Sequence, residues 1–174
     1  MIIFDTEAPA EAGAREALLD RAMGRARLLK PSERLRRGRA PARGLALVAR
    51  ERGRVVGSVR LWDVAAGSTD ALLLGPLAVD PEAQAQGIGA NLMRLAIGRA
   101  RDLGHRGIVL VGDAEYYARF GFTTTLTSGL AMPAPVDPRR FLGLELFEGA
   151  LAGAAGRLIA TGCPAPQKPV RLAA

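Results

Sequence analysis

The sequence predicts a mixed α/β (α+β) fold built on one central sheet, and two observations support this prediction. Residues 45–64 (LALVARERGRVVGSVRLWDV) hold two runs of β-forming residues around Glu51-Arg52-Gly53-Arg54, which is typical of a tight hairpin. Residues 72–112 then read as an apolar strand, a glycine-rich turn, an amphipathic helix and a second apolar strand. This order predicts a right-handed parallel crossover within the sheet.

The first part of the chain predicts two helices and a basic loop. In the stretch 11–23 (EAGAREALLDRAM), Ala14, Leu18, Leu19 and Ala22 fall on one side, as in a helix that packs one face on a core. A short second helix is expected to begin near Pro31-Ser32-Glu33. Gly38, Pro41 and Gly44 then break the chain into a loop that carries the basic cluster of residues 34–43.

The apolar run Leu72–Val79 contains Pro76 near its middle. Because proline cannot donate a ladder hydrogen bond, we expect this strand to be bulged or to leave one of its neighbours. After the glycine turn, Leu92, Ala96, Ala100 and Leu103 repeat at helical spacing, and Gly104 ends the helix. The run 107–112 (GIVLVG) predicts a strand that is covered on both faces.

The remaining residues predict shorter elements. We expect a short helix over 114–120, a strand over 122–126 (FTTTL), a loop-like stretch and another strand over 142–149. A further short strand is an option at 157–161, followed by a loose tail. The domain organisation predicted is one domain over 1–149 and a C-terminal extension over 150–174, since 174 residues are typical of a single domain.

Composition narrows the function classes. The net charge of +7 and the arginine cluster of residues 34–43 would fit a nucleic-acid partner, but aromatic residues make up only 5% of the chain, so nucleic acid is not expected. With one cysteine (Cys163) and one histidine (His105), neither a disulfide nor a metal site is expected. The chain shows no signal peptide or membrane-spanning run, so a cytoplasmic protein without a membrane partner is expected.

The junction between the strand and the helix is the most informative part of the chain. Gly87 and Gly89 stand where backbone N–H groups turn toward the start of a helix, whose dipole favours an anion such as a pyrophosphate. The dinucleotide fingerprint G-x-G-x-x-G lacks its third glycine here, and the Gly-Lys-Ser/Thr of a nucleotide P-loop is absent.

This segment resembles the acetyl-CoA signature of the GNAT superfamily of N-acetyltransferases, with Gln84, Gly87 and Gly89 in the matching positions. A second family motif is present as Tyr117, four residues before Gly121-Phe122. The run GDAEYYARFGF resembles a bacterial subgroup whose substrates are largely unassigned. The resemblance implies a GNAT fold: a mixed, mostly antiparallel sheet of about seven strands, splayed between strands 4 and 5 and flanked by about four helices.

The resemblance also implies roles for individual residues. Acetyl-CoA would be the acyl-donor cosubstrate, with no metal, and Tyr117 would protonate or hydrogen-bond the leaving thiolate. An oxyanion donor would be the main-chain N–H of Ala78 or Val79. The general base is harder to assign: Asp113 is preferred over Asp80 and Glu82, although capping or a water relay would explain each of them. The cofactor-binding residues would be Leu77, Ala78, Val79, Gln84, Ala85, Gln86, Gly87, Ile88, Gly89, Ala90, Asn91 and Tyr117.

The leading hypothesis is an enzyme that transfers acetyl from acetyl-CoA to a primary amine of a small molecule or peptide by direct attack in a ternary complex. Its acceptor pocket would be built from residues 60–62, the basic loop and residues 129–140. Two alternatives stay open: acetylation of a protein N-terminus or an aminoacyl-tRNA, and a non-catalytic acetyl-CoA-binding regulatory module. A homodimer is an option, and the sequence does not identify the acceptor.

Overall fold

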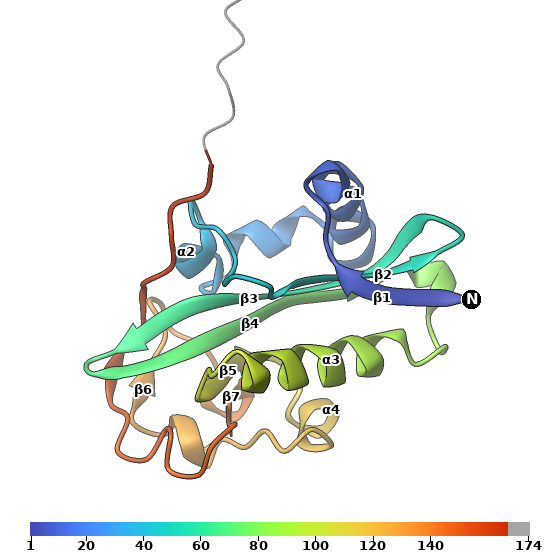
Figure 1. The fold of residues 1–174 in the computed structure, drawn as a ribbon. Helices are drawn as coiled ribbons and strands as arrows, with labels where there is room; N and C mark the ends of the chain where they lie inside the picture. Colours follow the sequence, from blue (N-terminus) through green and yellow to red (C-terminus); the bar gives the residue numbers. More distant parts are fainter. Residues whose placement is uncertain (167–174) are drawn as a thin grey trace, which may run out of the picture.

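The computed structural model describes residues 1–166, and at its centre is a seven-stranded sheet (Figure 1). Neighbouring strands are antiparallel, with the exception of the parallel pair β4–β5, which confirms the predicted mixed and mostly antiparallel sheet. The strands in sheet order are β1 (Ile2–Thr6), β2 (Ala46–Glu51), β3 (Arg54–Ala66), β4 (Thr69–Val79), β5 (Gly107–Val111) and β7 (Phe141–Glu145), with β9 (Ile159–Ala160) paired to β3.

Helices cover both faces of this sheet (Figure 1): α1 (Ala12–Met23) and α2 (Glu33–Arg36) lie on one face, α3 (Ile88–Asp102) and α4 (Ala114–Ala118) on the other. Successive strand residues enter opposite layers, as the period of a strand requires. Leu61, Leu72 and Ile108 belong to the buried cluster that includes α3. Their sequence neighbours Trp62, Leu73 and Val109 belong to the cluster that includes Leu35 of α2.

Short elements complete the fold. The two-residue strands β6 (Leu130–Ala131) and β8 (Gly156–Arg157) pair in a separate small sheet. Single 3-10 turns lie at η1 (Pro9–Glu11), η2 (Arg25–Leu29), η3 (Pro81–Ala83), η4 (Thr125–Thr127) and η5 (Pro138–Arg140).

The hairpin and the splay expected from the sequence are both present. The β2–β3 turn places Arg52 at φ 48° and Gly53 at φ 78°, the left-handed pair that a tight hairpin turn requires. β4 pairs with β5 through Leu72 and Leu73 alone. A bulge in the β3–β4 ladder then sets Gly75 and Pro76 opposite Arg60, and the Trp62 indole N–H donates to the Gly75 carbonyl at 2.6 Å. This confirms that the proline-bearing strand leaves a neighbour.

One predicted strand is wrong, and two strands were missed. Residues 122–126 form no strand: Thr123 makes a single bridge to Gly143, and the 3-10 turn η4 follows. The threonine hydroxyls satisfy local groups instead of favouring a ladder, since Thr123 and Thr125 hydroxyls bond at 2.8 Å and Thr127 Oγ1 donates to the Thr124 carbonyl at 3.0 Å. The missed strands are β1, which pairs with β2, and the two-residue strand β6, which lies in the stretch expected to be a loop.

The C-terminal segment packs against the sheet as far as it is described. The short strand considered at 157–161 is divided between β8 and β9, with Leu158 buried between them. The predicted loose tail includes residues 167–174, which lie outside the described residues. The domain boundary after residue 149 stays a prediction.

Candidate active site

The glycine turn connects the end of β4 to the start of α3. Asp80, which is buried, begins it: its carboxylate accepts from the Glu82 N–H at 3.1 Å and from Arg21 of α1 at 2.8 Å. These bonds hold the pKa of the Asp80 carboxyl below its usual value. Ala85 (φ 65°) and Gly87 (φ 72°) then adopt left-handed backbone conformations, and α3 begins at Ile88. The turn is therefore anchored on one side to α1 and on the other to α3.

The N-terminus of α3 carries no side-chain cap. Gly87 is its N-cap residue, and the first helical hydrogen bond runs from the Asn91 N–H to the Gly87 carbonyl at 3.0 Å. The N–H groups of Ile88, Gly89 and Ala90 therefore have no acceptor within the helix. Together with the helix dipole, they form an anion site of the kind expected from the sequence.

The predicted cofactor residues in this turn lie as follows. Ile88 is buried against Gly57 of β3, where a Cβ would come within 2.8 Å of the Ile88 side chain, so the start of α3 is fixed to the sheet. Asn91 is exposed, and its Oδ1 accepts from Arg94 at 3.3 Å. Gly89 faces α4, since a Cβ there would stand 3.2 Å from the Tyr116 hydroxyl. The other residues of the turn are exposed: Gln84, Ala85, Gln86 and Gly87.

Leu77, Ala78 and Val79 form the end of β4 beyond its contact with β5. They pair with Val59, Ser58 and Gly57 of β3, while the parallel ladder to β5 ends at Leu73 and Val109. The backbone groups of this segment that point away from β3 therefore face the gap between the strands. An extended ligand could pair with them like an added strand.

Tyr117 belongs to the short helix α4, which follows β5, and its side chain lies on the opposite side of this gap from the end of β4. Gly112 permits the position, because a Cβ there would lie 2.3 Å from Cε2 of the Tyr117 ring. The ring also packs edge-on against Tyr116 at 4.9 Å and against Phe122 at 5.9 Å between centroids. Burial, assisted by Tyr116 and Asp113, raises the pKa of Tyr117 to about 12. The phenol is therefore protonated throughout the physiological pH range.

A cavity of about 90 Å³ opens beside Tyr117, which we call the Tyr117 cavity. It lies at the splay, since Pro76 and Leu77 of β4 and Val111 of β5 line it. Its other lining residues come from α1, α2, the segment between them and the two strands: Met23, Arg27, Lys30, Ser32, Glu33, Arg36, Leu74, Gly75 and Leu110. Two of the predicted site residues, Leu77 and Tyr117, line this cavity.

Asp113 occupies a different position. It is exposed, does not line the Tyr117 cavity, and caps α4 by accepting from the Glu115 N–H at 3.1 Å. The carboxylate that does line this cavity is Glu33 of α2, which bonds Arg36 at 3.1 Å. Sequence reasoning missed Glu33, because it belongs to a four-residue helix whose docking depends on the tertiary fold. Arg36 was included only as part of the basic cluster of residues 34–43 expected near an acceptor pocket.

A second cavity, of about 220 Å³, lies on the other side of Pro76 and is called the Trp62 cavity. It shares Arg27, Glu33 and Arg36 with the Tyr117 cavity. Arg15, Arg60 and Trp62 also line it. Of residues 60–62, which were expected to contribute to an acceptor pocket, Arg60 and Trp62 line this cavity and Leu61 is buried in the core, and their role stays a prediction.

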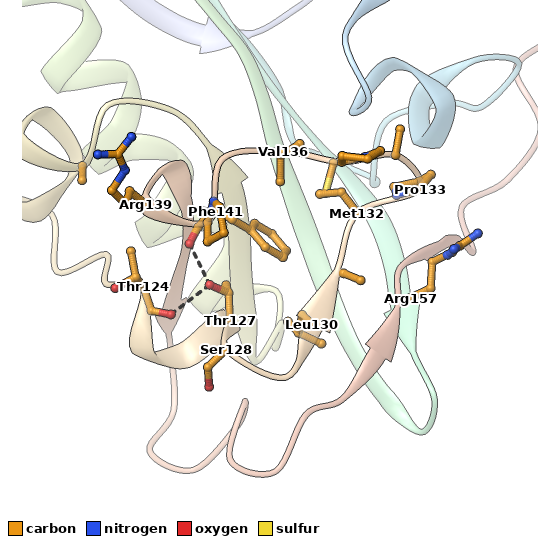
Figure 2. A pocket seen from close by; sticks show the side chains of 15 residues that line it. Thr124, Thr127, Ser128, Leu130, Met132, Pro133, Val136, Arg139, Phe141 and Arg157 are labelled. Atoms are coloured by element: carbon orange, nitrogen blue, oxygen red, sulfur yellow. Dashed lines mark hydrogen bonds between the residues drawn. The ribbon is translucent and has the colours of Figure 1, made fainter.

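A larger hollow, of about 930 Å³, is a mainly apolar groove (Figure 2). Met132, Pro133, Val136 and Phe141 border it, with Arg139 and Arg157 at its edges, and Thr127 bonds the Phe141 carbonyl at 2.7 Å below it. Within residues 1–166, this groove does not share lining residues with the Tyr117 cavity. Another hollow links them, because it shares Val136 with the groove and Val111 with the Tyr117 cavity. Residues 129–140 thus border a groove connected to the splay by common lining residues.

Two further observations concern residues 1–166. No helix in this range is long and apolar enough to cross a bilayer. The same residues hold no group of three or more His, Cys, Asp or Glu side chains that could bind a metal.

A sheet that opens between two parallel strands, with an uncapped helix N-terminus after one strand and a half-buried phenol after the other, defines an acyltransferase of the GNAT type. Residues 42–124 match the family model described as an acetyltransferase (GNAT) domain. The uncharacterized N-acetyltransferase YhbS of Escherichia coli K12 is 31% identical over 115 residues, which cover 64% of this chain and 69% of YhbS. The chain belongs to the GNAT family of acyl-CoA-dependent N-acetyltransferases.

Other comparisons agree with this assignment. The uncharacterized N-acetyltransferase YjhQ of E. coli K12 is 36% identical over 97 residues, and the match spans about half of its length (54%) and 53% of this chain. The crystal structure of E. coli YhbS in complex with CoA has a TM-score of 0.78 at 27% identity, covering 94% of this chain and 96% of that one. A GNAT family acetyltransferase from Brucella melitensis in complex with acetyl-CoA has a TM-score of 0.60 at 26% identity, covering 96% and 92%.

Proposed function

We propose that this chain transfers the acetyl group of acetyl-CoA to a primary amine of a small molecule or peptide, by direct attack in a ternary complex. One observation carries the proposal: the splay of β4 and β5 sets the uncapped start of α3 on one side and Tyr117 on the other. The relatives crystallised with CoA and acetyl-CoA support this choice of donor.

The residues present fit coenzyme A. The N–H groups of Ile88, Gly89 and Ala90 would hold its diphosphate, and the absence of a Cβ at Gly89 keeps the space beside the Tyr116 hydroxyl open. The free edge of Leu77, Ala78 and Val79 would pair with the pantetheine arm. When bound, acetyl-CoA supplies a thioester whose C–S bond breaks as the new C–N bond forms.

Three groups of this chain would act on the reacting atoms. The main-chain N–H of Ala78 or Val79 would stabilise the developing oxyanion. Tyr117, with its pKa of about 12, would donate a hydrogen bond to the leaving sulfur. Because a thiol titrates near pH ~8.5, complete proton transfer from this phenol is unfavourable, and hydrogen bonding is the favoured role. The amine would lose its proton to Glu33 or to water.

The structure favours a small acceptor over RNA. Within the basic cluster of residues 34–43, Arg36 is buried with Glu33, Arg39 donates to the Gly162 carbonyl at 2.8 Å, and Arg34 donates to the Pro133 carbonyl at 3.4 Å. These arginines bond protein groups, which supports a structural explanation of the cluster rather than a phosphate-binding one.

The test is a thiol-release screen with acetyl-CoA against a panel of amines, with Tyr117→Phe beside the wild type. We expect Tyr117→Phe to lower kcat at least tenfold while acetyl-CoA affinity, measured by calorimetry, changes less than threefold. For the wild type, a pH profile of kcat should show no descending limb below about pH 11 from this phenol, because burial raises its pKa and the protonated form persists below that value.

The matched control is Thr123→Val, which removes an exposed hydroxyl that bonds Thr125 and lines none of the cavities described above. Thermal midpoints of both variants establish that they fold. Thiol release by Tyr117→Phe at the wild-type rate would refute the assigned role of the phenol. Tight acetyl-CoA binding without thiol release on any amine would instead indicate a non-catalytic acetyl-CoA-binding module.

A further inference from the structure

The two cavities that meet at Pro76 have an unusual charge for the binding site of an amine. Their lining includes the cationic side chains of Arg15, Arg27, Lys30, Arg36 and Arg60. Only two carboxylates within the described residues line them, those of Glu16 and Glu33. A site that recognised an amine alone would be expected to show the opposite balance.

Most of these cations are engaged by carboxylates. Arg15 and Arg60 both bond Glu7, at 3.0 Å and 2.7 Å. Arg36 likewise bonds one carboxylate through Nε and Nη2, that of Glu33 on its own helix, at 3.2 Å and 3.1 Å. Its Nη1 lies toward the splay, 3.4 Å from the position of a Cβ on Gly75.

Arg27 adds a second, independent observation. Its side chain is 9% exposed and lines both cavities. Nη2 bonds Glu16 at 2.7 Å and Asp20 at 2.9 Å, whereas Nε is buried without an acceptor within residues 1–166. A buried donor left unpaired costs about 1–3 kcal/mol, so an oxyanion brought to this guanidinium would relieve a penalty already present in the protein.

Burial strengthens the attraction of both guanidinium groups for an oxyanion. The Arg36 side chain is also 9% exposed, and desolvation lowers the pKa of its guanidinium. A cation that has lost its water binds an oxyanion more strongly than an exposed one does, and guanidinium offers two parallel donors to a carboxylate. The position of Gly75 beside Arg36 is fixed as well, since the Trp62 indole N–H donates to the Gly75 carbonyl.

We infer that the acceptor carries a carboxylate in addition to its amine, with Arg36 and Arg27 binding the carboxylate beside Pro76 and the amine directed toward Tyr117. The inference rests on the proposed acetyl transfer and names its substrate class: an amino acid or a similarly small amino acid derivative. Cavities of about 90 and 220 Å³ suit a ligand of this size.

The experiment compares amino acids with their carboxamides, which share side chain and amine and differ in the charge of one group. We measure kcat/KM by thiol release, and binding to the CoA-saturated protein by calorimetry. The best amino acid should exceed its carboxamide at least tenfold in both. At neutral pH the less basic amine of the carboxamide is the less protonated of the two, so the amount of free amine favours the carboxamide and cannot produce this preference.

Variants at Arg36 test the assignment, because this residue bonds within its own short helix and its loss disturbs the core less than that of Arg27. Arg36→Gln should lower kcat/KM of the acid at least ten times more than kcat/KM of the carboxamide, so that the preference for the acid is lost even though the altered Glu33 pair slows both. Arg36→Lys, which keeps the positive charge, should keep part of the preference for the acid that Arg36→Gln loses. Arg101→Gln, an exposed arginine on α3, serves as the control, and acetyl-CoA affinity should be unchanged in all three.

The outcomes separate this inference from the proposed function. Equal turnover of acids and carboxamides, or an equal loss of both in Arg36→Gln, would overturn the inference and leave acetyl transfer in place. Preferred binding of the acid to the CoA complex without thiol release would support the recognition site and refute the enzyme. Failure of every amino acid to bind or react at millimolar concentration would overturn the inference.

Discussion

At the scale of single residues, the carboxylates near the site have two different roles: two of them cap the start of a helix or turn, and one faces the gap between β4 and β5. Asp80 and Asp113 each accept a backbone N–H two residues ahead, and Asp80 also bonds Arg21. Glu33 lines the Tyr117 cavity instead and has a half-buried side chain (21% exposed). Sequence position favoured Asp113, because strand ends border ligand crevices, but proximity to the gap favours Glu33.

This difference predicts the effect of neutralising each acid. Glu33→Gln should lower kcat at least tenfold at neutral pH, because the amine loses a nearby proton acceptor. Asp113→Asn should change the free energy of unfolding by about 0.5 kcal/mol or less, because asparagine caps a helix about as well as aspartate, and should leave kcat within threefold. Steady-state kinetics and urea denaturation of both variants make the comparison. A larger kcat loss in Asp113→Asn than in Glu33→Gln would return the role of base to Asp113.

At the scale of elements, α3 joins the sheet core to the anion site. Ile88, Leu92 and Met93 are buried on the sheet, so the first turn of the helix is held rigidly while its N–H groups remain uncapped. Rigid placement of donors matters because a binding site that is already ordered loses little entropy when the ligand arrives. Gly89 lies on the outer side of the same turn, facing Tyr116.

Gly89→Val is therefore expected to weaken acetyl-CoA binding at least tenfold, because a branched side chain would fill the space before the N–H groups. The unliganded fold should change little: Gly89 has no left-handed φ, and the nearest atom to an added Cβ is the end of the Tyr116 side chain at 3.2 Å. Gly98→Val is the matched control, on the same helix with no atom within 4 Å of the added Cβ. Calorimetric titration showing equal affinities for both variants would contradict the anion site.

At the scale of the whole molecule, the segment after residue 149 is part of the packed structure. Leu151, Ala154 and Leu158 belong to the same buried cluster as Trp62 and Leu73. Leu151 fits against Gly107 of β5, where a Cβ would come within 2.7 Å of Cδ2 of Leu151. The segment thus supports the layer of side chains beneath the Trp62 cavity.

A pair of neighbouring substitutions tests how much this segment contributes to stability. Leu158→Ala should lower the free energy of unfolding by about 2–5 kcal/mol, because Leu158 is 2% exposed and its loss leaves a cavity. Ile159→Ala, at 58% exposure on the adjacent strand β9, should cost about 1 kcal/mol or less. Urea denaturation measures both. Equal and small losses would support a domain that ends near residue 149.

The sequence by itself determined the elements whose local patterns are strong. Hairpin composition around Gly53, the helical repeat after Gly89 and the apolar run of β5 predicted their structures, and Pro76 predicted the departure of β4 from a neighbour. The threonines of residues 122–126 misled the prediction, because β propensity reflects packing on a sheet and their hydroxyls found local partners instead. β1 was missed because five residues show too little periodicity to be distinguished from a loop.

Only the tertiary structure decided what surrounds the gap. Glu33, Arg36 and Arg27 come from a 3-10 turn and a helix of four residues, and no spacing in the sequence relates them to Tyr117, some eighty residues away. Their meeting depends on how α2 docks beside the bulge at Pro76, which is a matter of long-range packing. Local patterns record the backbone conformation a segment adopts, whereas a binding site for a second substrate is assembled from side chains that only the closed fold brings together.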